Sequence, residues 1–108
     1  MCRFQDLYVG EEGYVVRCKT CRHYHLLFGG VILCMTENEF QKFGRTVAAC
    51  QHHLLTWKEG TDRPLPTVRQ GVHLLLNQQK MVRLHAILEA TTQTMLQLFE
   101  ANGPENRS

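Results

Sequence analysis

Three cysteines near the N-terminus have the residue type and spacing of a zinc site. Cys18 and Cys21 form a Cys-x-x-Cys pair, and Cys2 is the second residue of the sequence. A turn that carries such a pair lets both sulfurs bind one ion at about 2.3 Å, as in zinc knuckles. Spacing leaves the fourth ligand of a tetrahedral site open among five side chains: His23, His25, Cys34, His52 and His53.

His23 and His25 are nearest to the pair in sequence, and we take His23 as the fourth ligand. The predicted ligands of one Zn²⁺ are then Cys2, Cys18, Cys21 and His23. Basic residues nearby would offset the negative charge of a thiolate cluster: Arg3, Arg17, Lys19 and Arg22. Two alternatives stay open: unliganded thiols, or a thiol-based redox enzyme or sensor that uses Cys18 and Cys21. Redox pairs sit at helix N-termini, whereas Cys21 precedes a strand-like segment. A structural zinc site is therefore preferred, and no catalytic residue is predicted.

Residues 6–16 have the pattern of a β-hairpin that brings Cys2 to this pair. Apolar residues at 7–9 and 14–16 flank the turn sequence Gly10-Glu11-Glu12-Gly13. If the two glutamates form the turn, opposing residues have numbers that sum to about 23. Cys2 is then expected opposite Cys21, and Gln5 opposite Cys18.

A second hairpin is predicted at Gly29-Gly30, between strands at 22–28 and 31–35. This hairpin places His25 opposite Cys34. A nucleophilic Cys/His pair there is less favoured than an ordinary cross-strand pair, because both residues lie in mid-strand.

Segments 30–50 and 71–91 look like two copies of one strand–helix unit. In each copy an apolar run ends at a residue type that caps helices, Thr36 or Asn77. The apolar positions of the two following helices then share one register, which pairs Phe40 with Met81, Phe43 with Leu84 and Val47 with Leu88. The shared register predicts two helices packed on one face of a single sheet.

The remaining segments complete an α+β fold. We expect a connecting loop at 56–67, a strand at 68–76 that is bulged at Gly71, and a helix from Gln78 to about Ala101. Residues 1–104 are predicted to form one domain, with an N-terminal β-hairpin or ribbon, an antiparallel sheet of about four or five strands and two helices on one face. Residues 105–108 are expected to be a disordered tail.

Composition narrows the classes of function. The chain has 108 residues, 44% of them hydrophobic, and a formal net charge of +2. This charge is too small to indicate nucleic acid by itself, so a weak nucleic-acid binder is the last alternative. No export signal or membrane-spanning run is found, and we expect a cytoplasmic protein. A homodimer is also left open, because Ile87 and Phe99 flank the apolar seam of the second helix.

Four short motifs resemble a known family. They are Met1-Cys2, Gly13-Tyr14-Val15-Val16-x-Cys18-x-x-Cys21, Phe28-Gly29 and Thr36-Glu37-x-Glu39-Phe40. The pattern is similar to a family of small bacterial proteins of unknown function, and it covers most of the chain. The resemblance implies that Cys2, Cys18 and Cys21 act together, and it implies no activity. The sequence thus predicts a small zinc-stabilised interaction module, not an enzyme, with an unidentified protein partner.

Overall fold

The computed structural model describes residues 3–53, 57 and 60–102, the last four by their backbone alone. Within these residues the elements are β1 (Phe4–Val9), β2 (Gly13–Cys18), β3 (Tyr24–Phe28), β4 (Val31–Met35), α1 (Glu37–His52), β5 (Arg63–Pro66), β6 (His73–Leu76) and α2 (Gln78–Asn102). Strands β1 to β4 form an antiparallel sheet in chain order, and β5 pairs with β6 in a separate sheet. The fold is therefore α+β with an N-terminal hairpin, as predicted. The predicted tail at 105–108 lies outside the described residues.

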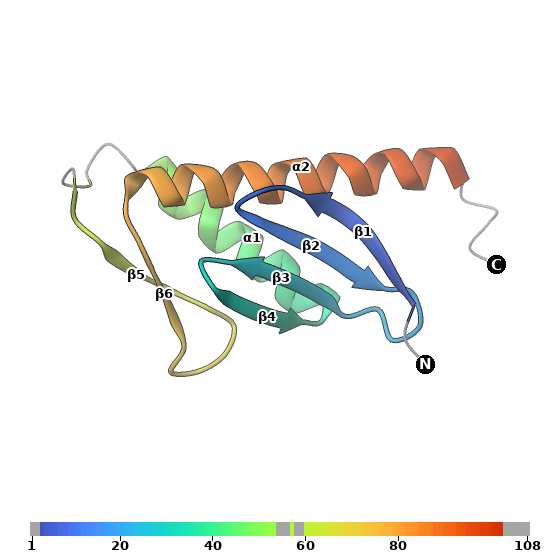
Figure 1. Ribbon diagram of the computed structural model, residues 1–108, viewed down its shortest axis with the longest axis horizontal. Helices are drawn as coiled ribbons and strands as arrows, with labels where there is room; N and C mark the ends of the chain where they lie inside the picture. Colours follow the sequence, from blue (N-terminus) through green and yellow to red (C-terminus); the bar gives the residue numbers. More distant parts are fainter. Residues whose placement is uncertain (1–2, 54–56, 58–59, 103–108) are drawn as a thin grey trace.

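One face of the four-stranded sheet forms the core with both helices. Val15, Leu26 and Leu33 lie opposite one another across β2, β3 and β4, and all three are buried. α1 packs against β4, and α2 runs along β1 and β2 (Figure 1). The other face is uncovered, and Ile32 on it is 54% exposed. This alternation of buried and exposed residues is typical of an antiparallel sheet with one wet face.

The hairpin of β3 and β4 confirms the predicted turn. Gly29 and Gly30 have positive φ angles of 61° and 78°, which a tight two-residue turn requires. The strand pairing places His25 opposite Cys34, as expected. Strand β3 begins at Tyr24, later than the predicted residue 22.

β1 and β2 change register at a β-bulge in β1. Near the turn, the pairs follow the predicted register. On the N-terminal side, Phe4 faces Cys18 and Gln5 faces Arg17. The predicted pairing of Gln5 with Cys18 is wrong by one residue, because the bulge adds one unpaired residue, Leu7, to β1.

The two strand–helix units have the predicted local structure. Thr36 caps α1, since its hydroxyl accepts from the Glu39 amide at 3.2 Å and the Glu39 carboxylate accepts from the Thr36 amide at 3.0 Å. Asn77 accepts from the Lys80 amide at 2.8 Å at the start of α2. The superposed apolar positions are buried in both copies: Phe40, Phe43 and Val47 in α1, and Met81, Leu84 and Leu88 in α2. The expectation of a single sheet is wrong, because β4 and β6 belong to different sheets.

The chain between the helices differs from prediction. The expected loop at 56–67 contains β5, and the strand expected at 68–76 starts only at His73. Pro64 and Pro66 lie two residues apart in an edge strand. Backbone nitrogens at alternate positions of a strand point to the same side, so both proline nitrogens, which carry no hydrogen, can point away from β6. Residues 68–71 form a bend and turn, in which Gly71 has a positive φ of 80°.

Arg69 ties the β5–β6 ribbon to the main sheet. Its guanidinium lies 2.9 Å from the Glu39 carboxylate and donates to the Cys34 carbonyl on the open edge of β4. The Glu39 carboxylate therefore both caps α1 and anchors the β5–β6 ribbon. Hydrogen bonds from the Thr36 backbone and from Arg69 lower the pKa of Glu39.

Gly13→Ala should disrupt the pairing of β2 with β3. A Cβ at this position would overlap the backbone carbonyl oxygen of Leu27, which cannot move without distorting β3. We expect a loss of about 1–3 kcal/mol in the free energy of unfolding, the usual cost of overpacking. Gly44→Ala in α1 is the control, since its Cβ would meet nothing within 4 Å. We expect this substitution to raise the free energy of unfolding by about 0.5–1 kcal/mol. Urea unfolding followed by circular dichroism measures both, and equal midpoints would contradict this account.

Glu39→Gln should lower the melting temperature at neutral pH, and the difference from the wild type should shrink as the pH falls below 4.5. The pKa of Glu39 is lower in the folded chain than its usual value of 4.5. Its stabilising contribution is thus present above that value and is lost as the pH falls through the folded pKa. Glu37→Gln, in the same helical turn, is the matched control. The same loss in both variants at neutral pH would assign the effect to the helix dipole rather than to the Thr36 and Arg69 contacts.

Candidate functional site

The predicted ligands lie around the turn that follows β2. The Cys18 amide donates to the His23 carbonyl at 2.9 Å, and the Arg22 amide donates to the Cys18 carbonyl at 2.8 Å. Arg22 has a positive φ of 64°, an unfavourable backbone conformation for a residue with a side chain. These contacts reverse the chain tightly and set His23 across from Cys18.

A backbone donor points at the first sulfur of the pair. Cys18 is fully buried, Cys21 is exposed, and the Cys21 amide nitrogen lies 3.4 Å from Cys18 Sγ. A hydrogen bond to a cysteine sulfur stabilises the thiolate and is one of the outer contacts that tune metal ligands. His23 Nδ1 lies 3.2 Å from the Cys21 carbonyl oxygen. Because a carbonyl only accepts, Nδ1 is the donor there, and in a neutral imidazole Nε2 is then the nitrogen that can bind a metal.

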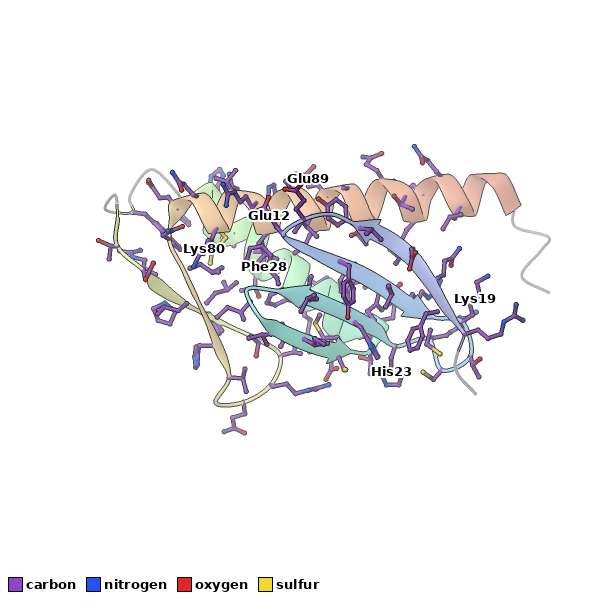
Figure 2. All side chains as sticks on the ribbon, viewed as in Figure 1. Glu12, Lys19, His23, Phe28, Lys80 and Glu89 are labelled. Carbon is purple, nitrogen blue, oxygen red and sulfur yellow. The ribbon has the colours of Figure 1, made fainter. Side chains whose placement is uncertain are left out.

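The N-terminal strand reaches the same turn. The Lys19 amide donates to the Arg3 carbonyl at 2.7 Å, and Phe4 faces Cys18. Cys2 lies outside the described residues, and one peptide bond joins it to Arg3. Figure 2 shows Lys19 and His23 at this end of the molecule.

Three of the other candidate ligands, Cys34, His52 and His53, lie away from this turn. Cys34 is on β4, two strands away from β2, and strands are about 4.8 Å apart, so its sulfur is too far from Cys18 to share one ion. His25 is paired with Cys34, and its ring centre is 5.2 Å from that of Phe4. His52 and His53 lie at the end of α1, at the opposite end of the molecule from the turn after β2 (Figure 1).

Residues 3–53, 57 and 60–102 contain no group of three or more His, Cys, Asp and Glu side chains that could hold a metal ion. The predicted site has three cysteines only when Cys2 is counted, and Cys2 is not among these residues. Cys18, Cys21 and His23 thus lie close together in sequence on one turn, but within the described part of the chain their side chains do not form a metal-binding group.

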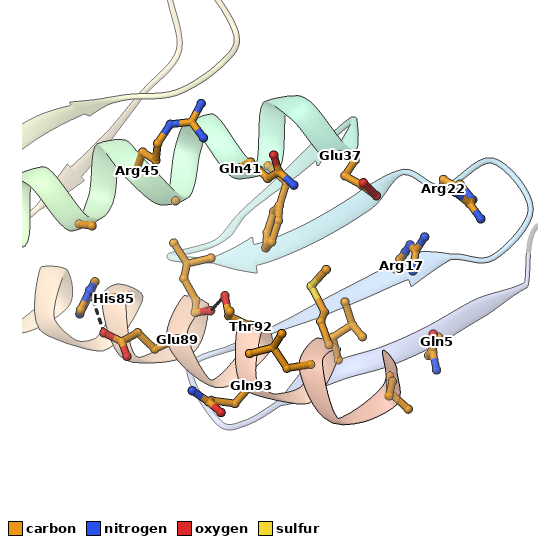
Figure 3. A pocket seen from close by; sticks show the side chains of 18 residues that line it. Gln5, Arg17, Arg22, Glu37, Gln41, Arg45, His85, Glu89, Thr92 and Gln93 are labelled. Atoms are coloured by element: carbon orange, nitrogen blue, oxygen red, sulfur yellow. Dashed lines mark hydrogen bonds and ion pairs between the residues drawn. The ribbon is translucent and has the colours of Figure 1, made fainter. Parts of the chain in front are cut away.

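A second candidate site, which the sequence did not predict, is a groove between α1 and α2 over the core face of the sheet (Figure 3). This inter-helix groove has a volume of about 1150 Å³. Phe40, Gly44 and Ala48 line it from α1, and Leu88 and Thr92 line it from α2. Gly44 and Ala48 lie one turn apart, and this pair of small residues is the sequence signal that could have indicated space beside α1.

Arg17 and Arg22 lie at one end of the inter-helix groove, near Glu37 (Figure 3). The Arg17 guanidinium carbon is 5.7 Å from the centre of the Tyr24 ring, a cation–π contact. Burial raises the pKa of Tyr24, and the charge of Arg17 opposes this shift. Arg17 Nε is buried and has no hydrogen-bond partner in the described part of the chain. Neither arginine forms an ion pair with any described residue.

One residue of the dimer prediction is not available for contact. Ile87, expected beside the apolar seam of α2, is 2% exposed and belongs to the core. The side chain of Phe99 lies outside the described residues. Self-association through α2 stays a prediction, without Ile87.

No helix in the described residues is long and apolar enough to cross a membrane. In comparisons with known proteins, no curated protein and no solved structure matches the chain. The sequence model of a family described as a family of unknown function (DUF6686) matches residues 1–103, which include both candidate sites. The chain therefore belongs to this family of unknown function.

Proposed function

We propose that the chain is a zinc-stabilised interaction module rather than an enzyme. Cys2, Cys18, Cys21 and His23 are the proposed ligands of one structural Zn²⁺. The observation that carries this proposal is the Cys21 amide directed at Cys18 Sγ at 3.4 Å. Such a donor favours the thiolate, which is the form of cysteine that binds zinc.

The surroundings of the turn suit a negatively charged cluster. Arg3, Lys19 and Arg22 are exposed cations on the turn or beside it, and Arg17 precedes Cys18 on β2. Three thiolates around one Zn²⁺ leave a net negative charge, which these cations offset. The free Nε2 of His23 adds a nitrogen ligand whose ring is oriented through Nδ1 by the Cys21 carbonyl.

Zinc at this turn would supply folding energy rather than catalysis. β1 is an edge strand, and the metal would fasten its N-terminal end to the turn after β2. The uncovered face of the sheet supports binding as the role of such a module, because Phe4, Val9 and Ile32 on it are each more than half exposed.

The second candidate is thiol redox chemistry at Cys18 and Cys21. It is supported by the contrast between an exposed Cys21 and a buried Cys18, since only one sulfur of the pair is open to a reagent. An oxidant of the disulfide class would take two electrons and two protons from the pair and form the Cys18–Cys21 disulfide.

Native mass spectrometry of protein prepared without added metal tests both candidates. We expect one zinc per chain in the wild type and none in Cys18→Ser/Cys21→Ser. Cys34→Ser/Cys50→Ser removes the same number of thiols away from the turn and should keep the zinc. A folded, metal-free wild type whose thiols react at once with an alkylating reagent would contradict the zinc proposal and favour the redox candidate.

The choice of histidine has its own test. His23→Ala should weaken zinc binding, measured by competition with a chromophoric chelator, because it removes the nitrogen ligand. His25→Ala, two residues away on β3, should leave the zinc affinity unchanged. Equal effects of the two substitutions would show that neither histidine is specifically a ligand.

A further inference from the structure

The inter-helix groove combines apolar walls with an unusual polar end. Phe40 lines it from α1, and Leu88 and Met95 line it from α2. Gly44 opens the wall of α1, since nothing lies within 4 Å of the position that its Cβ would occupy. A ligand in this groove would bury alkyl or aromatic surface, which is the main source of affinity in such sites.

The groove is long enough for an extended chain. Its lining on α1 runs from residue 37 to residue 48, which corresponds to about 17 Å along the helix axis. The lining on α2 runs from residue 85 to residue 98. The two helices therefore form opposite walls of an elongated groove over Leu7 of β1, rather than a compact pocket.

The polar end carries more positive than negative charge. Arg17 Nε is buried without a hydrogen-bond partner in the described residues, and an unsatisfied buried donor is costly. Arg22 also lines this end and has no ion pair among the described residues. Glu37 is the opposing charge there, which leaves two cations against one carboxylate. At the other end Glu89 is paired with His85 at 3.2 Å, and Arg45 of α1 is the arginine that lines the groove there (Figure 3).

We propose that the inter-helix groove binds a free amphipathic carboxylate, with its head group at Arg17 and Arg22 and its alkyl chain between α1 and α2. A guanidinium pairs with a carboxylate through two parallel hydrogen bonds, and the head group would supply the counter-charge for Arg17 and Arg22, which form no ion pair with a described residue. A purely apolar ligand would supply no such counter-charge. A small inorganic anion would leave apolar lining such as Leu96 of α2, which is 52% exposed, in contact with water.

Decanoate is a suitable probe, used below the concentration at which it forms micelles, on the full chain as purified. In ¹H–¹⁵N correlation spectra we expect saturable shifts at Gly44, Ala48 and Thr92. Decyltrimethylammonium has the same chain with a cationic head, and it should bind at least tenfold more weakly. Equal binding of the two probes would overturn the proposal, because the chain alone would then account for affinity. Shifts centred on Ile32 would overturn it as well, since they would place binding on the uncovered sheet face.

Two pairs of variants locate the ligand. Arg17→Gln/Arg22→Gln should weaken decanoate binding at least tenfold, whereas Lys42→Gln, on an exposed position of α1 outside the lining, should change it less than twofold. Gly44→Leu should abolish binding by filling the groove, and Gly44→Ala should keep it. Unchanged binding in Arg17→Gln/Arg22→Gln or in Gly44→Leu would overturn the proposal.

Two further measurements keep the test specific. The zinc content of each variant, from native mass spectrometry, separates damage to the turn after β2 from loss of the ligand site, so failure of the zinc proposal does not decide this one. Groove shifts that depend on protein concentration without decanoate would identify a second copy of the chain as the occupant and would overturn the proposal.

Discussion

The ring of Tyr24 is the point at which the sheet and both helices meet. It stacks on Phe40 of α1 with ring centres 4.4 Å apart and planes inclined by 4°. Its hydroxyl lies 3.9 Å from Met95 Sδ of α2, and the Arg17 guanidinium of β2 lies against its face. Since one rigid, fully buried ring contacts three elements at once, it sets the separation of α1 and α2 over the sheet. Phe40, Met95 and Arg17 also line the inter-helix groove, so this spacing shapes the candidate ligand site.

Elements that depend on neighbouring residues could be predicted from the sequence. The cap at Thr36 involves Glu39 three residues later, and the turn at Gly29-Gly30 follows from the backbone angles that glycine permits. The burial register shared by the two strand–helix units was visible for a similar reason. A helical seam repeats every three or four residues, so two copies of it can be compared within the sequence itself.

Elements that depend on distant contacts could not be predicted from the sequence. β5 has prolines at two of its four positions, and it exists because Leu65 between them is 1% exposed and joins the core with Leu74 and Trp57. The bulge in β1 likewise places Leu7 in the core, and it shifts the pairing of β1 with β2 by one residue. Both are cases in which tertiary burial outweighs local preference, and no pattern within either strand indicates it.

The two candidate sites differ in the same respect, since one depends on neighbouring residues and the other on distant contacts. The turn after β2 links them. Cys18, Cys21 and His23 are close in sequence and could be found by spacing, whereas the groove joins residues from four separate elements. Arg22 directly follows Cys21, and the hydrogen bond from its amide to Cys18 holds it in a left-handed conformation at the end of the groove. Zinc on the cysteines would rigidify the backbone that directs Arg22 and so reduce the ordering cost of binding a carboxylate there.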